Sequence, residues 1–247
     1  MLLTVDHLYK TYHRQGQSFF AVKDLSFRLK SGEILVVAGE SGSGKSTLCR
    51  LICQFIQPDK GQIFLHDQDI THVPVKKQKE LYRHIQMVFQ QPYRSFHPRY
   101  TLKKSVLMGV KNYHLPLAKE QWENLLREVH LHPSLLERYP RQVSGGECQR
   151  AALLRALLLS PELLICDEAT SALDADIRLD LAALIQHICK RHHIACLFVT
   201  HDLDLAQKLA DRILIMHNGQ IIESGTAKEI FEQPQEEYTK ELLAARL

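Results

Sequence analysis

The segment GESGSGKST, residues 39 to 47, constrains the fold of this chain more than any other stretch. It fits the pattern G-x-x-x-x-G-K-[ST], follows the apolar run EILVVAG and opens a segment, Lys45 to Ile56, with apolar residues at helical spacing. A buried strand, a glycine-rich loop and a helix in this order predict a loop that binds nucleotide phosphates. The lysine would face the β- and γ-phosphates, the serine after it would hold Mg²⁺, and the threonine would assist on the α-phosphate side. The predicted nucleotide-binding residues are Gly39, Glu40, Ser41, Gly42, Ser43, Gly44, Lys45, Ser46 and Thr47.

Two carboxylates end a second apolar strand, LLICDE, at residues 163 to 168. A pair of acids at the end of a buried strand is costly unless a metal ion or a proton compensates it. We therefore predict that Asp167 holds Mg²⁺ and that Glu168 is the general base for an attacking water. The alternative is a solvated acid pair at the strand end.

The segment VSGGECQR, residues 143 to 150, predicts a helix N-terminus. Ser144 and Glu147 fit a capping box, so a plain helix start, running to about Leu159, is one interpretation. A plain cap does not need Gly145 and Gly146, which instead allow an anion to approach bare N–H groups. One active site does not need two phosphate-binding helix ends. We therefore predict a dimer in which this segment closes the nucleotide site of the partner, with the Glu147 carboxylate folded back onto the cap.

The order of apolar patterns predicts an α/β fold. Residues 1 to 30 hold two alternating runs typical of antiparallel edge strands, and residues 92 to about 158 predict an inserted helical subdomain, including a helix face of Trp122, Leu125, Leu126 and Val129. Strands return in ELLICD, IACLFVTH and DRILIMHNGQIIESG, the last as a hairpin turning at residues 217 to 219. The intervening helix presents a stripe of Leu173, Ile177, Leu181, Leu184 and Ile188. With no linker-like segment, residues 1–247 are expected to form one catalytic unit.

Composition excludes several classes. The balance of 31 Lys and Arg against 28 Asp and Glu gives a net charge of +3, which does not suggest a nucleic-acid partner. The six cysteines lie in apolar stretches without paired CxxC spacing, so we expect reduced, mostly buried thiols. No signal peptide and no membrane span is expected, so the protein would be cytosolic or dock on a membrane through other chains.

These motifs, in this order and over nearly the whole length, resemble the nucleotide-binding subunit of an ABC (ATP-binding cassette) transporter. The resemblance implies a RecA-like P-loop NTPase core with an antiparallel β edge subdomain and an inserted helical subdomain, and ATP hydrolysis with Mg²⁺ coupled to transport. It also implies that Tyr12, or less well Phe20, stacks on adenine, that Gln90 in QMVFQQP reaches Mg²⁺ and the attacking water, and that His201 in FVTHD contacts the γ-phosphate. SALD, which is Ser171, Ala172, Leu173 and Asp174, would cross the dimer interface. Without a nucleotide partner these residues would be ordinary packing or surface groups.

Two further stretches resemble the peptide/nickel importer group: SFHPR at residues 95 to 99 and QPQEEYTKELLAA near the C-terminus. Members of that group often continue into a cysteine-containing tail associated with an iron–sulfur cluster. No cysteine follows Cys196 here, so we predict no cluster. The implied partners are a second ATPase, identical or different, two permease subunits and, indirectly, an extracytoplasmic solute-binding protein, with this chain at the cytoplasmic face of the inner membrane. Peptides, nickel or metal chelates are the implied cargo. A soluble accessory ATPase, as in carbon–phosphorus bond cleavage, is the alternative; a P-loop kinase or GTPase would leave VSGGE and His201 unexplained.

Overall fold

A six-stranded sheet forms the centre of the molecule, in a computed structural model that describes residues 1–14, 17–171 and 173–245. Its strand order is β10-β9-β3-β8-β7-β6, and only β10 runs antiparallel to its neighbour. Both faces of a parallel sheet are covered, which explains why β3 and β8 are buried at every position. The strands are β3 (Ile34–Ala38), β6 (Ile85–Phe89), β7 (Leu163–Asp167), β8 (Ala195–Thr200), β9 (Arg212–His217) and β10 (Gln220–Thr226).

Alternate residues of the central strands face two different cores. Ile34, Val36 and Ala38 pack into a core with the helices that follow β6, β7 and β8. Leu35 and Val37 face the opposite side, where helix α1 (Lys45–Ile52) packs between this sheet and a second one. The period-2 geometry of a strand thus lets five residues join both halves of the molecule.

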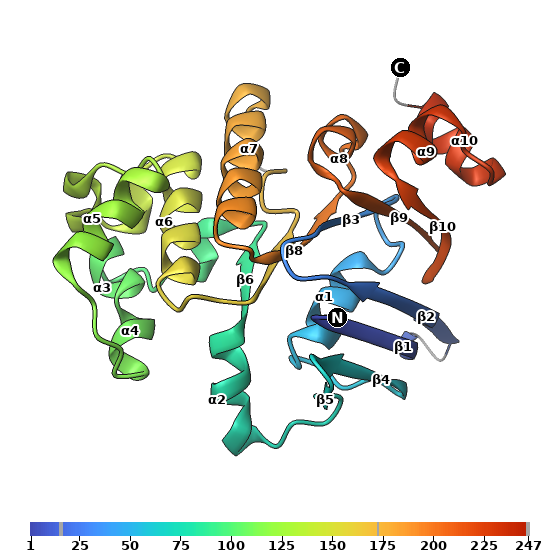
Figure 1. Ribbon diagram of the computed structural model, residues 1–247, viewed down its shortest axis with the longest axis horizontal. Coiled ribbons are helices and arrows are strands. Elements are labelled where there is room, and N and C mark those ends of the chain that lie inside the picture. Colours follow the sequence, from blue (N-terminus) through green and yellow to red (C-terminus); the bar gives the residue numbers. More distant parts are fainter. Residues whose placement is uncertain (15–16, 172, 246–247) are drawn as a thin grey trace.

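The second sheet is antiparallel, with strand order β2-β1-β4-β5. Its strands are β1 (Leu3–Arg14), β2 (Gln17–Leu29), β4 (Lys60–Leu65) and β5 (Gln68–Asp69). This confirms the two antiparallel strands predicted for residues 1 to 30. In Figure 1 this sheet lies beside α1 and below the central sheet.

All the regular elements described between β6 and β7 are helices. Leu125, Leu126 and Val129 are buried and Trp122 packs against the same core, as the periodicity predicted. Figure 1 shows this helical group on the side away from the antiparallel sheet. Its elements are η1 (Pro92–Ser95), α3 (Leu102–Val106), α4 (Met108–Asn112), α5 (Lys119–Glu128), η2 (Pro133–Glu137), η3 (Pro140–Gln142) and α6 (Gly145–Leu157).

The other helices flank the sheets: α1 (Lys45–Ile52), α2 (Val75–His84), α7 (Ala175–Arg191), α8 (Leu203–Leu209), α9 (Ala227–Glu232) and α10 (Glu237–Ala244). Helix α1 is shorter than predicted because Gln54 adopts a left-handed backbone conformation, with φ of 57°, just after the helix end. The stripe predicted for α7 was wrong at Ile177, which is 37% exposed. Leu173 precedes the helix yet packs against the core, and Leu181, Leu184 and Ile188 are buried.

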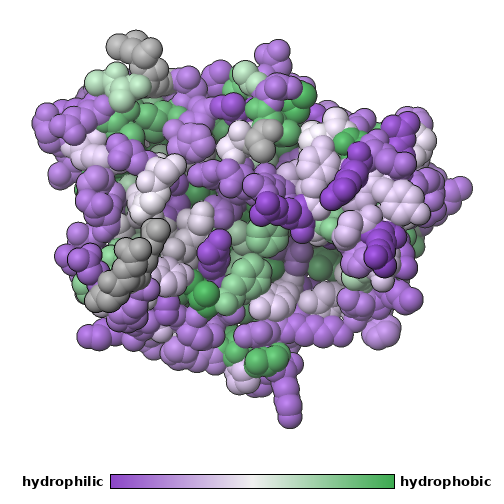
Figure 2. Space-filling model, turned by 180° about the vertical axis from the view of Figure 1, so that it is seen from behind, coloured by the Kyte–Doolittle hydropathy of each residue, from purple (hydrophilic) through white to green (hydrophobic). Residues whose placement is uncertain are grey.

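The outer surface is mostly hydrophilic. Figure 2 shows the face opposite to that of Figure 1, where apolar side chains gather only in small, separate patches. Among the described residues, no helix combines the length and the apolar character needed to cross a bilayer. All six cysteines are free and buried, as predicted.

Candidate functional site

The phosphate loop joins the end of β3 to the start of α1 and is held from two sides. A Cβ atom at Gly39 would lie 2.1 Å from the carbonyl oxygen of Met216, and one at Gly44 would lie 2.0 Å from that of Ala21. Both glycines have positive φ, so only glycine fits there. The backbone N–H of Gly219 also donates to the carbonyl oxygen of Ser43 at 3.0 Å. The β9–β10 hairpin and β2 therefore fix the shape of the loop.

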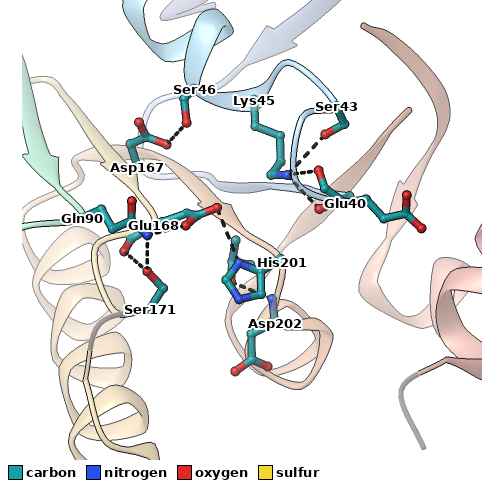
Figure 3. Close-up of polar contacts among 12 residues, drawn as sticks. Glu40, Ser43, Lys45, Ser46, Gln90, Asp167, Glu168, Ser171, His201 and Asp202 are labelled. Atoms are coloured by element: carbon teal, nitrogen blue, oxygen red, sulfur yellow. Dashed lines mark hydrogen bonds and ion pairs between the residues drawn. The ribbon is translucent and has the colours of Figure 1, made fainter. Parts of the chain in front are cut away.

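Lys45 is almost fully buried within this loop. Its ammonium donates to the carbonyl oxygens of Gly39 at 2.7 Å and Glu40 at 2.6 Å, as Figure 3 shows. Burial lowers the pKa of Lys45, while the charges of Glu168 and Asp167 act to raise it. A buried cation that contacts mainly neutral oxygens is well placed to gain a phosphate anion.

Asp167, at the end of β7, lies against the start of α1. The Ser46 hydroxyl donates to its Oδ1 at 2.8 Å. Burial raises the pKa of Asp167, the Ser46 hydrogen bond opposes this shift, and the charge of Glu168 adds to it. A hydroxyl and a carboxylate in contact, with a second carboxylate next along the chain, form a donor set of the kind that hard cations such as Mg²⁺ prefer. The residues present therefore fit a magnesium ion.

Glu168 is the centre of a polar cluster drawn from three neighbouring strands. Gln90 follows β6, Glu168 follows β7 and His201 follows β8, so parallel strands deliver all three to one edge of the sheet. The Gln90 amide donates to the Glu168 carboxylate at 2.8 Å and to the Ser171 hydroxyl at 3.0 Å, and His201 Nδ1 lies 3.5 Å from the other Glu168 oxygen. Glu168 itself has φ of 49°, a left-handed conformation that is uncommon for a residue with a side chain.

A cavity of about 380 Å³ opens over the phosphate loop. Tyr12 forms part of the cavity wall. The centroid of the Tyr12 ring lies 6.0 Å from that of Phe19. Phe20, the alternative to Tyr12 for stacking on adenine, does not line this cavity. Its ring centroid lies 6.4 Å from that of Tyr9. The lining residues are Tyr12, Phe19, Ala21, Ser41, Gly42, Gly44, Lys45, Ser46, Thr47 and Glu168.

The segment Ser144 to Glu147, called the signature segment from here on, forms the N-terminus of α6. The Ser144 hydroxyl accepts from the Glu147 N–H at 3.2 Å, and the Glu147 carboxylate accepts from the Ser144 N–H at 2.7 Å. This confirms the capping box and the folded-back Glu147. Within the described part of the chain, no residue of Ser144 to Glu147 lines the cavity at the phosphate loop, and Figure 1 shows α6 in the helical group away from α1.

The glycines of this segment also have a packing role that the sequence reasoning missed. A Cβ atom at Gly146 would lie 2.9 Å from Ile177 Cγ2, and one at Gly145 would lie 3.1 Å from Leu173 Cδ2. These glycines therefore allow α7 and the segment before it to pack closely on α6, in addition to any contact with an anion. Of the SALD residues, Ser171 contacts Gln90 and Asp174 precedes α7, whereas Ala172 lies outside the described residues.

Comparison with known proteins identifies this arrangement. The profile of the ABC transporter family matches residues 22–171, more than half of the chain. The chain belongs to this family. It is an ABC transporter ATPase with the cassette fold, as the motifs predicted.

Curated relatives match this ABC ATPase over nearly its full length. The oligopeptide transport ATP-binding protein OppF of Haemophilus influenzae is 36% identical, covering 99% of this chain and 78% of that protein. The oligopeptide transport ATP-binding protein AppF of Bacillus subtilis is 38% identical, covering 95% and 72%. The glutathione import ATP-binding protein GsiA of Salmonella typhimurium is 38% identical over 95% of this chain, which spans 38% of that protein.

Solved structures share the fold. The cassette MJ0796, in a dimeric post-hydrolysis state bound to ADP and phosphate, superposes with a TM-score of 0.82 at 25% identity, covering 92% of this chain and 99% of that one. CbiO1 of Clostridium perfringens, part of a CbiONQ transporter complex, gives a TM-score of 0.81 at 26% identity, covering 94% and 91%.

The structure adds two features to the site of this ABC ATPase that the motifs did not predict. Phe19 lies beside Tyr12 because the two residues are paired across β1 and β2, a register that the alternation in either strand alone does not specify. The contacts of Met216 and Gly219 with the phosphate loop also could not be predicted from the motifs, because the hairpin is remote in sequence from the loop.

Proposed function

We propose that this chain is the ATP-hydrolysing subunit of an importer, and that it binds ATP with Mg²⁺ between its own phosphate loop and the signature segment of a second cassette. The observation that carries the proposal is the convergence of Gln90 and His201 on Glu168, which lines the same cavity as Lys45 and Ser46, with the signature helix outside that cavity. Residues 1–247 would act as one cassette, with residues 92 to about 158 as its helical subdomain.

Each group around the cavity has a proposed role. The loop N–H groups and Lys45 bind the phosphates, and Tyr12, with Phe19 beside it, stacks on the adenine. Ser46, Asp167 and Gln90 would hold Mg²⁺, which supplies positive charge against the phosphate oxygens. Glu168 removes a proton from the attacking water, and Gln90 holds its carboxylate in place. His201 contacts the γ-phosphate from the neighbouring strand end.

The partner site follows from the position of α6. Ser144, Gly145, Gly146 and the N-terminus of α6 would complete the nucleotide site of the second cassette, with the segment Ser171 to Asp174 at the interface. The dimeric state of the structural relative MJ0796 supports this arrangement. Closure of the two cassettes would move the helical subdomains, which dock on two permease subunits at the cytoplasmic face of the inner membrane.

The cargo is proposed to be a peptide, delivered by an extracytoplasmic binding protein. Relatives named for oligopeptide and glutathione transport support this class. The stretches SFHPR and PQEEYTKELL resemble the wider peptide/nickel group, so nickel and metal chelates form the second cargo class to test.

Affinity purification tests this proposal. Tagged Glu168→Gln protein would be isolated from detergent-solubilised membranes with ATP, and co-purifying chains would be identified by mass spectrometry. We expect two multi-span permeases and a second cassette, and we expect the cassette contact to weaken when ATP is omitted. Soluble partners without any membrane chain would refute the importer and favour an accessory ATPase.

A further inference from the structure

The C-terminal helix α10 is fixed to the hairpin that supports the phosphate loop. The Glu223 carboxylate, on β10, accepts from the backbone N–H of Gln235 at 2.8 Å and of Glu236 at 3.3 Å, just before the helix begins. Thr239 is fully buried on the inner side of α10. The motif YTKELL therefore packs against the molecule as an ordered element, and the site described above leaves it without a role.

Tyr238, the first residue of that motif, packs its ring against His217 at the end of β9. Its ring centroid lies 3.9 Å from that of His217, with the ring planes at 41°. Its hydroxyl is enclosed and faces the backbone N–H of Glu40. Burial raises the pKa of Tyr238, the backbone amide of Glu40 acts to lower it, and the Glu40 carboxylate acts to raise it. Tyr238 thus lies between the hairpin and the first half of the phosphate loop.

Met216, directly before His217, and Gly219, two residues after it, hold the phosphate loop. Met216 presents its carbonyl oxygen to Gly39, and Gly219 donates to the carbonyl oxygen of Ser43. The hairpin turn is short, because Gln220 pairs directly with His217, so a shift of His217 moves both contacts. Stacking of an aromatic ring on His217 restrains such a shift.

We propose that Tyr238 is a positioning residue for the phosphate loop, acting through its ring contact with His217. The inference rests on the proposed ATP site and assigns the C-terminal helix to that site. It follows that nucleotide affinity depends on a side chain far from the loop in sequence. Because the loop binds the phosphates already in the ground state, we expect its disturbance to weaken nucleotide binding more than it lowers the turnover number kcat.

The test compares Tyr238→Ala with Tyr238→Phe. Loss of an aromatic ring contact changes an equilibrium constant by about fivefold, so Tyr238→Ala should raise the Kd for a fluorescent ATP analogue and the KM for ATP by about that factor, with kcat within about twofold. Tyr238→Phe keeps the ring and should restore both values. His217→Ala should reproduce the effect, and adding Tyr238→Ala to it should raise the Kd by little more.

Leu242→Ala is the matched control, because Leu242 lies on the same helix as Tyr238 and both side chains pack against the same hydrophobic core. We expect its nucleotide Kd to match that of the unaltered protein, with thermal unfolding used to check that each variant is folded. An unchanged Kd in Tyr238→Ala, an equal effect of Leu242→Ala, or full additivity with His217→Ala would each overturn the proposal. Absence of nucleotide binding by the unaltered chain would refute the ATP site itself, and the positioning role with it.

Discussion

Among single residues, Glu168 combines a left-handed backbone conformation with a carboxylate that accepts a hydrogen bond from Gln90. The ring of His201 lies near the other oxygen of that carboxylate. A glutamine at this position keeps the size of the side chain and cannot accept a proton from water. We expect Glu168→Gln to lower ATP hydrolysis by about 10²- to 10⁴-fold, the usual contribution of a general base. Nucleotide binding should persist, because the loop and Lys45 are untouched. Steady-state phosphate release and the Kd for ATP measure the two effects.

Glu162 offers a control for this substitution. Its carboxylate contacts His66 and His84 and does not line the cavity over the phosphate loop. Glu162→Gln should hydrolyse ATP within about twofold of the unaltered rate. Normal phosphate release by Glu168→Gln would contradict the assignment of the base.

At the scale of elements, the contact between α6 and α7 depends on Gly146. Alanine in place of glycine within a helix stabilises by about 0.5–1 kcal/mol, whereas overpacking costs about 1–3 kcal/mol. Because a Cβ there would lie 2.9 Å from Ile177 Cγ2, the overpacking should win. We expect Gly146→Ala to lower the free energy of unfolding by about 1 kcal/mol, measured by denaturant titration.

The sign of this effect should reverse when Ile177 is shortened. In an Ile177→Ala background the obstructing methyl group is gone, so adding Gly146→Ala should stabilise the protein through helix propensity alone. Equal losses in both backgrounds would show that Ile177 is not the obstacle. Hydrolysis by the double variant would then report separately whether the extra methyl group blocks the partner nucleotide.

The join between β1 and the start of β4 depends on Asp59. The hydrogen bond from Lys10, at 2.8 Å, is the main cause that lowers the pKa of Asp59, and the Thr11 N–H also donates to this carboxylate. A lowered folded-state pKa stabilises the fold above the unfolded value, near 3.9, and this stabilisation is lost as the pH falls through the folded value.

Asp59→Asn should therefore destabilise the protein at pH 7, with a difference from the unaltered chain that shrinks below about pH 4. Unfolding titrations of both proteins at several pH values measure that difference. A constant difference from pH 7 to pH 3 would mean that shape, rather than charge, explains the role of Asp59.

Local pattern was enough to predict the elements that carry the site. The phosphate loop, the strand before Asp167 and the cap at Ser144 are specified by residues within a few positions of each other, so spacing alone found them. The α7 stripe failed at Ile177 because helical spacing marks a face without saying what covers it. Helix α2 was missed because its segment is mostly polar, with Leu81 as its one residue described as buried.

Contacts set by strand register or by tertiary packing could not be predicted from this sequence. The pairing of Tyr12 with Phe19, the hydrogen bond from Gly219 to Ser43 and the stacking of Tyr238 on His217 each depend on register or on tertiary packing. The roles assigned to the site residues stay predictions until the variants above are measured.

At the scale of the whole molecule, the two cores enclose every thiol. Burial raises the pKa of Cys53 and of Cys148 to about 12, so the reactive thiolate is scarce at neutral pH. Ellman's reagent should label the native protein slowly and all six thiols at once in denaturant. A fast-reacting thiol in the native protein would contradict this, and Val75→Cys, at a position that is 81% exposed, supplies the positive control.

The place of β3 in the central sheet has a consequence for biosynthesis. This strand carries the phosphate loop near the start of the chain, yet both of its neighbours, β8 and β9, come from residues 195–217. A ribosome therefore releases the loop long before it releases the strands and the hairpin that shape it. The nascent chain must remain without a formed nucleotide site until residues 195–226 have emerged, and the cell obtains a working ATPase only after that point.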